Sequence, residues 1–308
     1  MEEEMKIKTK DLLTLNELSK SELLGIIDNA IKLKKDLKKG ISKPILKNKT
    51  LAMIFQKPST RTRVSFETGM FQLGGHALNL SADDLQLKRG ETIEDTAKTL
   101  SRYVDIIMAR VYSHEEVEIL AKNSTVPVIN GLSDSFHPCQ ILADLMTIKE
   151  KKKKLAGLKL AWIGDGNNVC NSMIYGCAKT SIDVTIATPK GYEPNSDIIK
   201  ESKKFIDVQL LTDPLSAVKD ADVVVTDTFV SIHHQATDRT KDFLPRFQVN
   251  SNLLKKADRD AIFLHCLPAK RGQEVTGEVI DGPQSVIWDE AENRLHAQKA
   301  LMASLLRV

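Results

Sequence analysis

The feature that most constrains the fold is a regular alternation of short apolar runs with longer amphipathic segments. The apolar runs have the length and composition of buried strands. They lie at residues 51–55, 76–80, 105–109, 126–129, 158–164, 182–187, 208–211, 222–226 and 261–265. Segments with helical spacing of their apolar residues separate most of them. Strands connected in this β-α-β manner lie parallel and are covered by helices on both faces.

We therefore predict an α/β fold with two doubly wound parallel sheets. A chain of 308 residues is long enough for two domains, each with its own core. The boundary falls near residues 145–157, where a helical segment ends in a run of lysines before Gly157. Sheets of this type bind ligands beyond the carboxyl ends of their strands, so functional residues are expected there.

Composition and charge exclude several classes of function. The formal net charge of +3 does not favour nucleic acid as a partner. No segment reaches the roughly 18 consecutive apolar residues of a membrane span. The acidic start, Met1-Glu2-Glu3-Glu4-Met5, does not resemble a signal peptide, and the cysteines lack the C-x-x-C spacing of a zinc knuckle. We expect a cytoplasmic protein with free thiols, and no membrane partner.

The turn after the first predicted strand has the character of an anion site. Pro58 ends the strand, and Ser59 or Thr60 can cap a helix that begins there. Free amide groups of that first turn, the hydroxyls of residues 59, 60 and 62 and one guanidinium would converge on a phosphate. Arg61 and Arg63 point about 200° apart on a helix, so only one can face the anion. We assign Arg61 to the anion and Arg63 to a salt bridge; a capped helix with a solvated basic turn is the alternative.

Three further polar side chains follow strand ends of the first half. Arg110 ends the strand at 105–109, where a guanidinium suits a phosphate ligand better than a surface ion pair. His137 stands at the start of a helix that Pro138 opens, with Gln140 one turn further on. Next to a phosphate site, His137 is a candidate donor to a developing oxyanion, although a structural histidine has the same sequence pattern.

The strand ends of the second half carry an amide-rich turn, an aspartate and a cysteine. Gly164-Asp165-Gly166-Asn167-Asn168-Val169 begins like a dinucleotide fingerprint, but Val169 occupies the place of the third glycine. This disfavours a nicotinamide cofactor. Asp227 and Cys266 follow the strands at 222–226 and 261–265, where an aspartate could hold a cationic group or could cap a helix.

Taken in order, these motifs resemble the transcarbamylases (the aspartate/ornithine carbamoyltransferase family), most closely the members that act on ornithine. The resemblance runs from about residue 7 to the end. It rests on Ser59-Thr60-Arg61-Thr62-Arg63, Asp95-Thr96-Ala97, Arg110, His137-Pro138-x-Gln140, Gly164-Asp165-x-Asn167-Asn168, Asp227-Thr228, His265-Cys266-Leu267-Pro268 and Glu292-Asn293-Arg294. Each motif alone is weak, whereas the ordered set is highly specific.

The resemblance implies transfer of a carbamoyl group from carbamoyl phosphate to the δ-amine of L-ornithine, giving L-citrulline and phosphate. It implies a role in arginine biosynthesis, with no cofactor and no metal. It also implies a carbamoyl-phosphate domain at 1–150 with the C-terminal helix 290–308, and an ornithine domain at 151–289. A trimer, or a multiple of trimers, is expected, with Gln86 on a loop that reaches a neighbouring subunit.

Residue roles follow from the same resemblance. The catalytic residues would be Arg61, Arg110, His137 and Cys266. Carbamoyl phosphate would be bound by Ser59, Thr60, Arg61, Thr62, Gln86, Arg110, His137, Gln140, Cys266, Leu267 and Arg294. Ornithine would be bound by Asn168, Asp227, Ser231 and Ile232. Asp227 and Cys266 also have a physical rationale, because the ammonium group of ornithine must be held and deprotonated before it can attack.

One stretch departs from the family pattern. The enzymes that act on ornithine usually carry Asp-Thr-Trp followed by Ser-Met-Gly, whereas here Phe229 replaces the Trp and Ser231-Ile232-His233-His234-Gln235 replaces the rest. Acetylornithine, putrescine and aspartate are therefore alternative acceptors, and a non-catalytic phosphate-binding regulator is the alternative from another class. Adjacent histidines diverge in direction, so His233 and His234 are expected to be exposed loop residues and not a metal pair.

Overall fold

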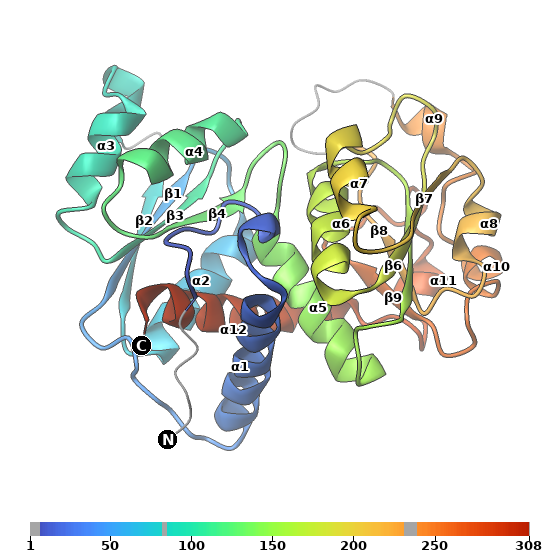
Figure 1. Cartoon of the computed structure of the whole chain (residues 1–308), viewed down its shortest axis with the longest axis horizontal. Helices are drawn as coiled ribbons and strands as arrows, with labels where there is room; N and C mark the ends of the chain where they lie inside the picture. The colour runs from blue at the N-terminus through green and yellow to red at the C-terminus, as the bar shows by residue number, and fades with distance from the viewer. Residues whose placement is uncertain (1–6, 82–84, 231–238, 308) are drawn as a thin grey trace. The chain divides into compact units, whose positions relative to one another are not determined.

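The computed structural model contains two parallel sheets, one of four strands and one of five, with flanking helices (Figure 1). This confirms the predicted α/β class. The structure describes residues 7–81, 85–230 and 239–307. The chain divides into unit 1, which comprises Met1–Met146 and Glu292–Val308, and unit 2, which comprises Thr147–Ala291.

The sheet of unit 1 has the strand order β2-β1-β3-β4, and every pair is parallel. Its strands are β1 (Thr50–Phe55), β2 (His76–Ser81), β3 (Ile106–Arg110) and β4 (Val128–Leu132). The prediction of a strand at 126–129 was wrong at both ends. Asn130-Gly131 reads as a turn, but the strand passes through it with a register shift opposite Ala109 and Arg110. Gly131 packs closely there: a Cβ would lie 2.4 Å from the Met108 sulfur and 3.2 Å from the Ala109 carbonyl oxygen.

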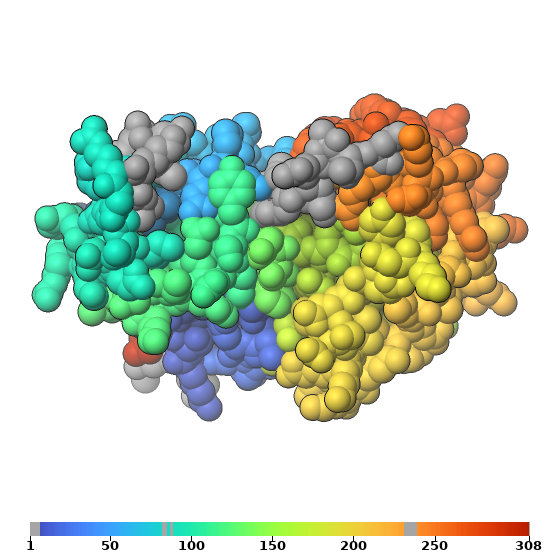
Figure 2. All heavy atoms as spheres, turned by 90° about the horizontal axis from the view of Figure 1, so that it is seen from above, coloured from blue at the N-terminus to red at the C-terminus, as the bar shows by residue number. Residues whose placement is uncertain are grey.

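Helices cover both faces of this sheet. They are α1 (Lys20–Lys38), α2 (Thr60–Gln72), α3 (Ile93–Leu100), α4 (His114–Asn123), α5 (Pro138–Lys152) and α12 (Ile287–Leu306), with the 3-10 helices η1 (Leu15–Glu17) and η2 (Gln86–Arg89). On one face, Ala52, Ile54, Ile107 and Ala109 of the sheet pack against α3 and α4; these helices form the teal and green surface in Figure 2. Gly69 of α2 lies against Lys299 and Met302 of α12. The C-terminal helix is thus part of the core of unit 1.

The sheet of unit 2 has the order β7-β6-β5-β8-β9, again entirely parallel. Its strands are β5 (Lys159–Ile163), β6 (Asp183–Ala187), β7 (Val208–Leu211), β8 (Val223–Thr226) and β9 (Ile262–His265). Its helices are α6 (Asn168–Thr180), α7 (Ser196–Ser202), α8 (Pro214–Val218), α9 (Thr240–Phe243), α10 (Ser251–Leu254) and α11 (Gly277–Ile280). A large apolar core that includes Ile163, Phe229, Phe243, Phe263 and Ile287 lies on one face of this sheet.

Each sheet has one point where the strand order reverses, and Arg110 and Asp227 lie at these two points. In unit 1 the reversal separates β1 from β3, whose last residues, Phe55 and Arg110, are register partners. In unit 2 it separates β5 from β8, where Ile163 pairs with Thr226. Such crevices are the usual binding positions of open α/β sheets. Within the part of the chain that the structure describes, no helix is long and apolar enough to cross a membrane.

Candidate active site

The turn after β1 in unit 1 forms the predicted cap of α2. Ser59 is the N-cap, and its hydroxyl accepts a hydrogen bond from the amide of Thr62 at 3.3 Å. Arg63 points to solvent and pairs with Glu67 at 3.4 Å, in agreement with its assigned salt bridge. Arg61 is partly buried and Thr60 is exposed. The positive end of α2 therefore lies at the β1/β3 crevice, where it can attract an anion.

Arg110, at the end of β3, and His137, after β4, are both buried. The Arg110 carbonyl accepts the amide of Gln56, the residue after β1, at 3.0 Å. Only 8% of Arg110 and 5% of His137 is exposed, so neither is a solvated surface residue. His137 precedes α5, and its carbonyl accepts the amide of Gln140 at 3.1 Å. The two groups end β3 and begin α5, as the sequence predicted.

Arg294 on α12 joins two other predicted residues of unit 1. Its guanidinium donates to the Gln140 side chain at 2.6 Å, to Gln298 at 3.1 Å and to the Thr62 hydroxyl at 3.4 Å. The amide nitrogen of Gln140 donates in turn to Asp144 at 2.8 Å. These side chains are almost fully buried. The network fixes the first turn of α2 relative to α5 and α12, which preorganises the crevice.

A second connection reinforces the same turn. Gln298 donates to the Ser65 hydroxyl at 2.7 Å, and Ser65 donates to the carbonyl of Arg61 at 2.6 Å. Ser65 lies about one turn after the start of α2, and Gln298 lies on α12. Gln86, by contrast, begins η2 with an exposed side chain.

Sequence reasoning missed Lys57, which precedes Pro58 in the same turn. Its side chain is 7% exposed and its ammonium lies 3.9 Å from the centre of the Tyr112 ring. Burial lowers the pKa of Lys57, and the nearby charge of Arg110 lowers it further. Two buried cations at one crevice favour an anionic ligand. The sequence pattern that could have identified Lys57 is a lysine between a buried strand and a helix cap.

In unit 2, Asp227 directly follows β8 and is 5% exposed. One carboxylate oxygen accepts Asn167 Nδ2 at 2.8 Å. The other accepts the Thr228 amide at 2.7 Å and the Cys266 thiol at 3.2 Å. All these donors are neutral, so the carboxylate retains the capacity to bind a cation. The structure thus brings Asp227 and Cys266 together, as expected for residues at the ends of neighbouring strands.

Cys266 and Leu267 lie on a backbone held by His265. Leu267 has a left-handed backbone with φ of 59°, an uncommon conformation for this residue type. Its amide donates to His265 Nδ1 at 2.9 Å, and His265 Nε2 lies 3.2 Å from Glu274. These contacts fix the backbone that presents the Cys266 thiol and the Leu267 carbonyl.

Cys266 is the only cysteine of the four that is not fully buried. Burial raises the pKa of Cys139 to about 12 and that of Cys170 well above its usual value. Those two thiols are therefore inert at neutral pH. Cys266 is the cysteine that is accessible to a ligand.

Asp227, His265 and Cys266 offer ligand atoms within 4.8 Å of one another, a spacing that a metal ion could bridge. Both ring nitrogens of His265 are, however, already engaged by Leu267 and Glu274. Metal binding would require these contacts to break. The arrangement is better suited to holding an amine through the carboxylate and the thiol.

Asn168 begins α6 and is buried, and its side chain accepts the amide of Val169 at 3.1 Å. Phe229, which stands where the family usually has Trp, is fully buried and stacks on Phe243 with ring centres 4.4 Å apart. This departure is therefore accommodated inside the core of unit 2. Ser231 and Ile232, predicted as ornithine ligands, and His233 and His234 lie outside the described residues.

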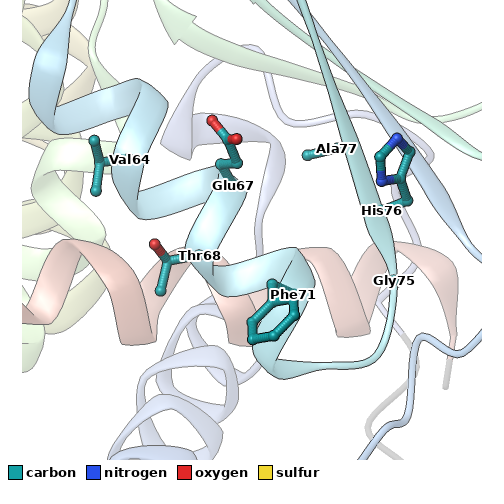
Figure 3. A pocket seen from close by; sticks show the side chains of 7 residues that line it. All are labelled: Val64, Glu67, Thr68, Phe71, Gly75, His76 and Ala77. Carbon is teal, nitrogen blue, oxygen red and sulfur yellow. The ribbon is translucent and has the colours of Figure 1, made fainter.

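A separate pocket of about 490 Å³ lies on the outer side of α2, away from its first turn (Figure 3). Val64, Thr68 and Phe71 of α2 line it, together with His76 and Ala77 at the start of β2. Val64 is 55% exposed and Phe71 is 80% exposed. This pocket contains no residue of the predicted site.

Comparisons with known families match nearly the whole chain. Residues 10–150 match the family described as aspartate/ornithine carbamoyltransferase, carbamoyl-P binding domain. Residues 156–305 match aspartate/ornithine carbamoyltransferase, Asp/Orn binding domain. The chain is 63% identical over 302 residues to ornithine carbamoyltransferase of Cenarchaeum symbiosum, covering 98% of this chain and 99% of that protein. It is 57% identical over 307 residues to the enzyme of that name from Pyrococcus horikoshii, covering 97% and 96%.

Solved structures give the same result. Ornithine carbamoyltransferase from Pyrococcus furiosus superposes with a TM-score of 0.91 at 57% identity, covering 95% of this chain and 96% of that one. The structure from Thermus thermophilus, called by the same name, has a TM-score of 0.89 at 43% identity, covering 97% and 99%.

Proposed function

The chain belongs to the aspartate/ornithine carbamoyltransferase family, and we infer that it transfers the carbamoyl group of carbamoyl phosphate to the δ-amine of L-ornithine. The products are L-citrulline and phosphate. At the level of residues, the inference rests on buried Asp227 beside Cys266 in unit 2. A carboxylate with neutral donors around it binds an ammonium group, whereas it would repel the second carboxylate of aspartate.

We propose that unit 1 binds carbamoyl phosphate. The amides and hydroxyls of residues 59–62, with Arg61, would hold the phosphate at the positive end of α2. Arg110 and His137 would donate to the carbonyl oxygen as its charge grows during attack. Gln140, oriented by Arg294 at 2.6 Å, would fix the carbamoyl nitrogen. Phosphate then leaves without needing a metal ion or a cofactor.

We propose that unit 2 binds ornithine. Asp227 would hold the α-ammonium, and Asn168 the α-carboxylate end, together with Ser231 and the Ile232 backbone. The Cys266 thiol and the Leu267 carbonyl would lie beside the δ-amine, which attacks in its uncharged form. The thiol donates to Asp227 at 3.2 Å, so the Cys266 sulfur could take a proton from the δ-ammonium as the thiol proton passes to the Asp227 carboxylate. In terms of domains, we assign 1–150 with 290–308 to carbamoyl phosphate and 151–289 to ornithine.

The assembly we propose is a homo-oligomer built from trimers, with the Gln86 loop serving a neighbouring site. The exposed Phe71 and Val64 and the edge strand β2 support a protein contact on that side of unit 1. Mixing Gln86→Ala with Arg110→Ala subunits tests the shared site. Recovered activity after subunit exchange is expected; exchange without recovery would contradict it.

The chain acts in arginine biosynthesis, and one relative, from Pyrococcus furiosus, is named as an anabolic enzyme. We place it in the cytoplasm because its four cysteines are free thiols, which is usual in a reducing compartment. Fractionation of the source cells would test this placement.

The decisive experiment is a panel of acceptor amines assayed with carbamoyl phosphate. Citrulline from ornithine should form at a rate well above carbamoylation of acetylornithine, putrescine or aspartate. Carbamoyl-aspartate as the only product would overturn the assignment. Tight binding of carbamoyl phosphate without turnover of any amine would instead indicate a regulator.

A further inference from the structure

A buried ion pair in unit 2 lies next to the ornithine half-site but is not part of the chemistry described above. Arg239 Nη2 is 3.1 Å from both carboxylate oxygens of Asp165. The two side chains are only 14% and 6% exposed. The guanidinium also lies over the Tyr192 ring, 4.8 Å from its centre. An ion pair this well shielded from water has a strong interaction and a high cost of disruption.

The position of Asp165 explains why its charge matters. It is the second residue after β5, and Asp227 is the first residue after the neighbouring strand β8, whose last residue, Thr226, pairs with Ile163. Burial raises the pKa of Asp165 to about 6; the charge of Arg239 opposes that rise and the charge of Asp227 adds to it. Two carboxyl groups thus share one crevice, and the cation of Arg239 compensates one of them. Among the described residues, the hydrogen-bond donors to Asp227 are neutral, so its charge is left to bind the substrate.

The same pair connects several segments of the half-site. Asn167, two residues after Asp165, donates to Asp227 at 2.8 Å. Arg239 is the residue before α9, and Phe243 at the end of α9 stacks on Phe229, two residues after Asp227. The turn after β5 and the two chain segments that flank residues 231–238 are therefore tied together. The ion pair joins the turn after β5, which carries Asn167, to the segment that begins α9.

Resting on the proposed function, we propose that Arg239 and Asp165 are positioning residues that hold Asp227 as the ammonium-binding carboxylate and thereby set the affinity for ornithine. Arg239 touches no reacting atom in this proposal. It compensates the Asp165 charge and fixes the turn that carries Asn167. Loss of Arg239 alone removes the cation that compensates Asp165 and the contact that fixes the turn of Asn167, which should disturb ornithine binding and not carbamoyl-phosphate binding.

The test is steady-state kinetics on the full-length enzyme with each substrate varied in turn. Arg239→Gln should raise the KM for ornithine by about tenfold or more, because one partner of a buried ion pair is removed. The KM for carbamoyl phosphate should change by less than about twofold. Arg246→Gln is the matched control. Arg246 lies over Phe247 and pairs with Asp213 at 3.8 Å, but its side chain is 60% exposed, so both KM values should stay at the wild-type level.

The double variant Asp165→Asn/Arg239→Gln separates positioning from simple destabilisation. It contains no unpaired charge, so it should fold and recover most of the loss, with an ornithine KM about threefold above wild type because the tie to α9 is gone. If Arg239→Gln folds and its KM for ornithine equals that of the wild type, the inference is wrong. If only the double variant folds, a wild-type KM for ornithine in that variant would overturn it. So would an equal rise in both KM values. Failure of the wild-type enzyme to make citrulline would instead end the proposed function.

Discussion

At the strand-order reversal of unit 1 the buried charged side chains include two cations, Lys57 and Arg110, whereas at that of unit 2 they include two carboxylates, Asp165 and Asp227. The cations lie near the backbone amides at the positive end of α2, and together these groups create a positive electrostatic potential that suits a phosphate. The carboxylates are hydrogen-bonded to one arginine and to neutral donors, and together these groups create a negative electrostatic potential that suits an ammonium group. Two similar sheets thus present opposite charges at equivalent positions.

This difference shows how one reaction can be divided between two similar units. A phosphate can be held by backbone amides, which any sequence supplies, so unit 1 needs few specific side chains beyond its cations. An ammonium group must be held by a buried carboxylate, and burial of that charge costs desolvation free energy. Unit 2 therefore requires hydrogen bonds and an ion pair that offset this cost. We expect substitutions in each unit to affect mainly one substrate.

The largest effect should come from Arg110. Arg110→Gln should lower kcat by about 10²–10³, because a preorganised donor to the developing oxyanion is weakened. The KM for ornithine should change little. Citrulline formation under saturating substrates is the measurement. Arg63→Gln is the matched control, since Arg63 is exposed and pairs with Glu67; a comparable loss in both variants would mean that the effect is not specific to the crevice.

Asp227 tests the other side of the comparison. Asp227→Asn removes a charge-assisted hydrogen bond worth about 1.5–3 kcal/mol, so the KM for ornithine should rise by about 10- to 100-fold. Carbamoyl phosphate should bind as in the wild type, which isothermal titration calorimetry can measure directly. Asp281→Asn, at an exposed aspartate that pairs with Arg271, should leave both unchanged. An equal loss of affinity for both substrates would break the proposed division.

Much of the fold could be predicted from the sequence because the strands are short, apolar and separated by helical spacing. The parallel strands, a cap of α2 at Ser59 or Thr60 and the start of α5 at Pro138 were all predicted from local patterns, and the structure has the cap at Ser59. The end of β4 was not, because Asn130-Gly131 has the composition of a turn. The four-residue helices α9, α10 and α11 were missed as well, since one turn gives no periodic signal.

Some residues of the candidate site could likewise be predicted from the sequence, and others could not. Residues at strand ends, such as Arg110 and Asp227, are visible in the sequence because parallel strands present their carboxyl ends at one edge. Contacts between distant segments are not visible. Arg294 meets Gln140 and Thr62 across 154 and 232 positions of the chain. The pairing of Asp165 with Arg239, 74 positions apart, likewise depends on how the units fold and not on any local pattern.

Lys57 sharpens the comparison, because its removal shows whether unit 1 uses the Lys57 charge in addition to that of Arg110. Lys57→Met keeps the aliphatic stem but removes the charge, so the KM for carbamoyl phosphate should rise by about tenfold, with little change in that for ornithine. Lys98→Met is the control; Lys98 is exposed and 3.6 Å from Asp95. A carbamoyl-phosphate KM equal to that of the control would show that Arg110 and the α2 amides suffice.

The smallest effect concerns stability, and here two buried groups, His296 in unit 1 and Asp165 in unit 2, should respond to pH with opposite sign. Burial, and next the charge of Lys299, lowers the pKa of His296 in unit 1 from 6.5 to about 4. Between these values the unfolded state binds the proton and the folded state does not, so acidification destabilises the fold. Asp165 in unit 2, with its pKa raised to about 6, takes up a proton in the folded state first and works in the other direction.

His296→Gln should therefore flatten the loss of stability on acidification. For the wild type, the His296 contribution to the free energy of unfolding should fall by about 1 kcal/mol between pH 7 and pH 5.5, and the variant should lack that part. Urea titrations at the two pH values measure it, with His76→Gln as the control because His76 is exposed. If the variant and the control lose the same free energy, the folded and unfolded states bind the His296 proton equally well. The loss of stability on acidification then does not come from His296.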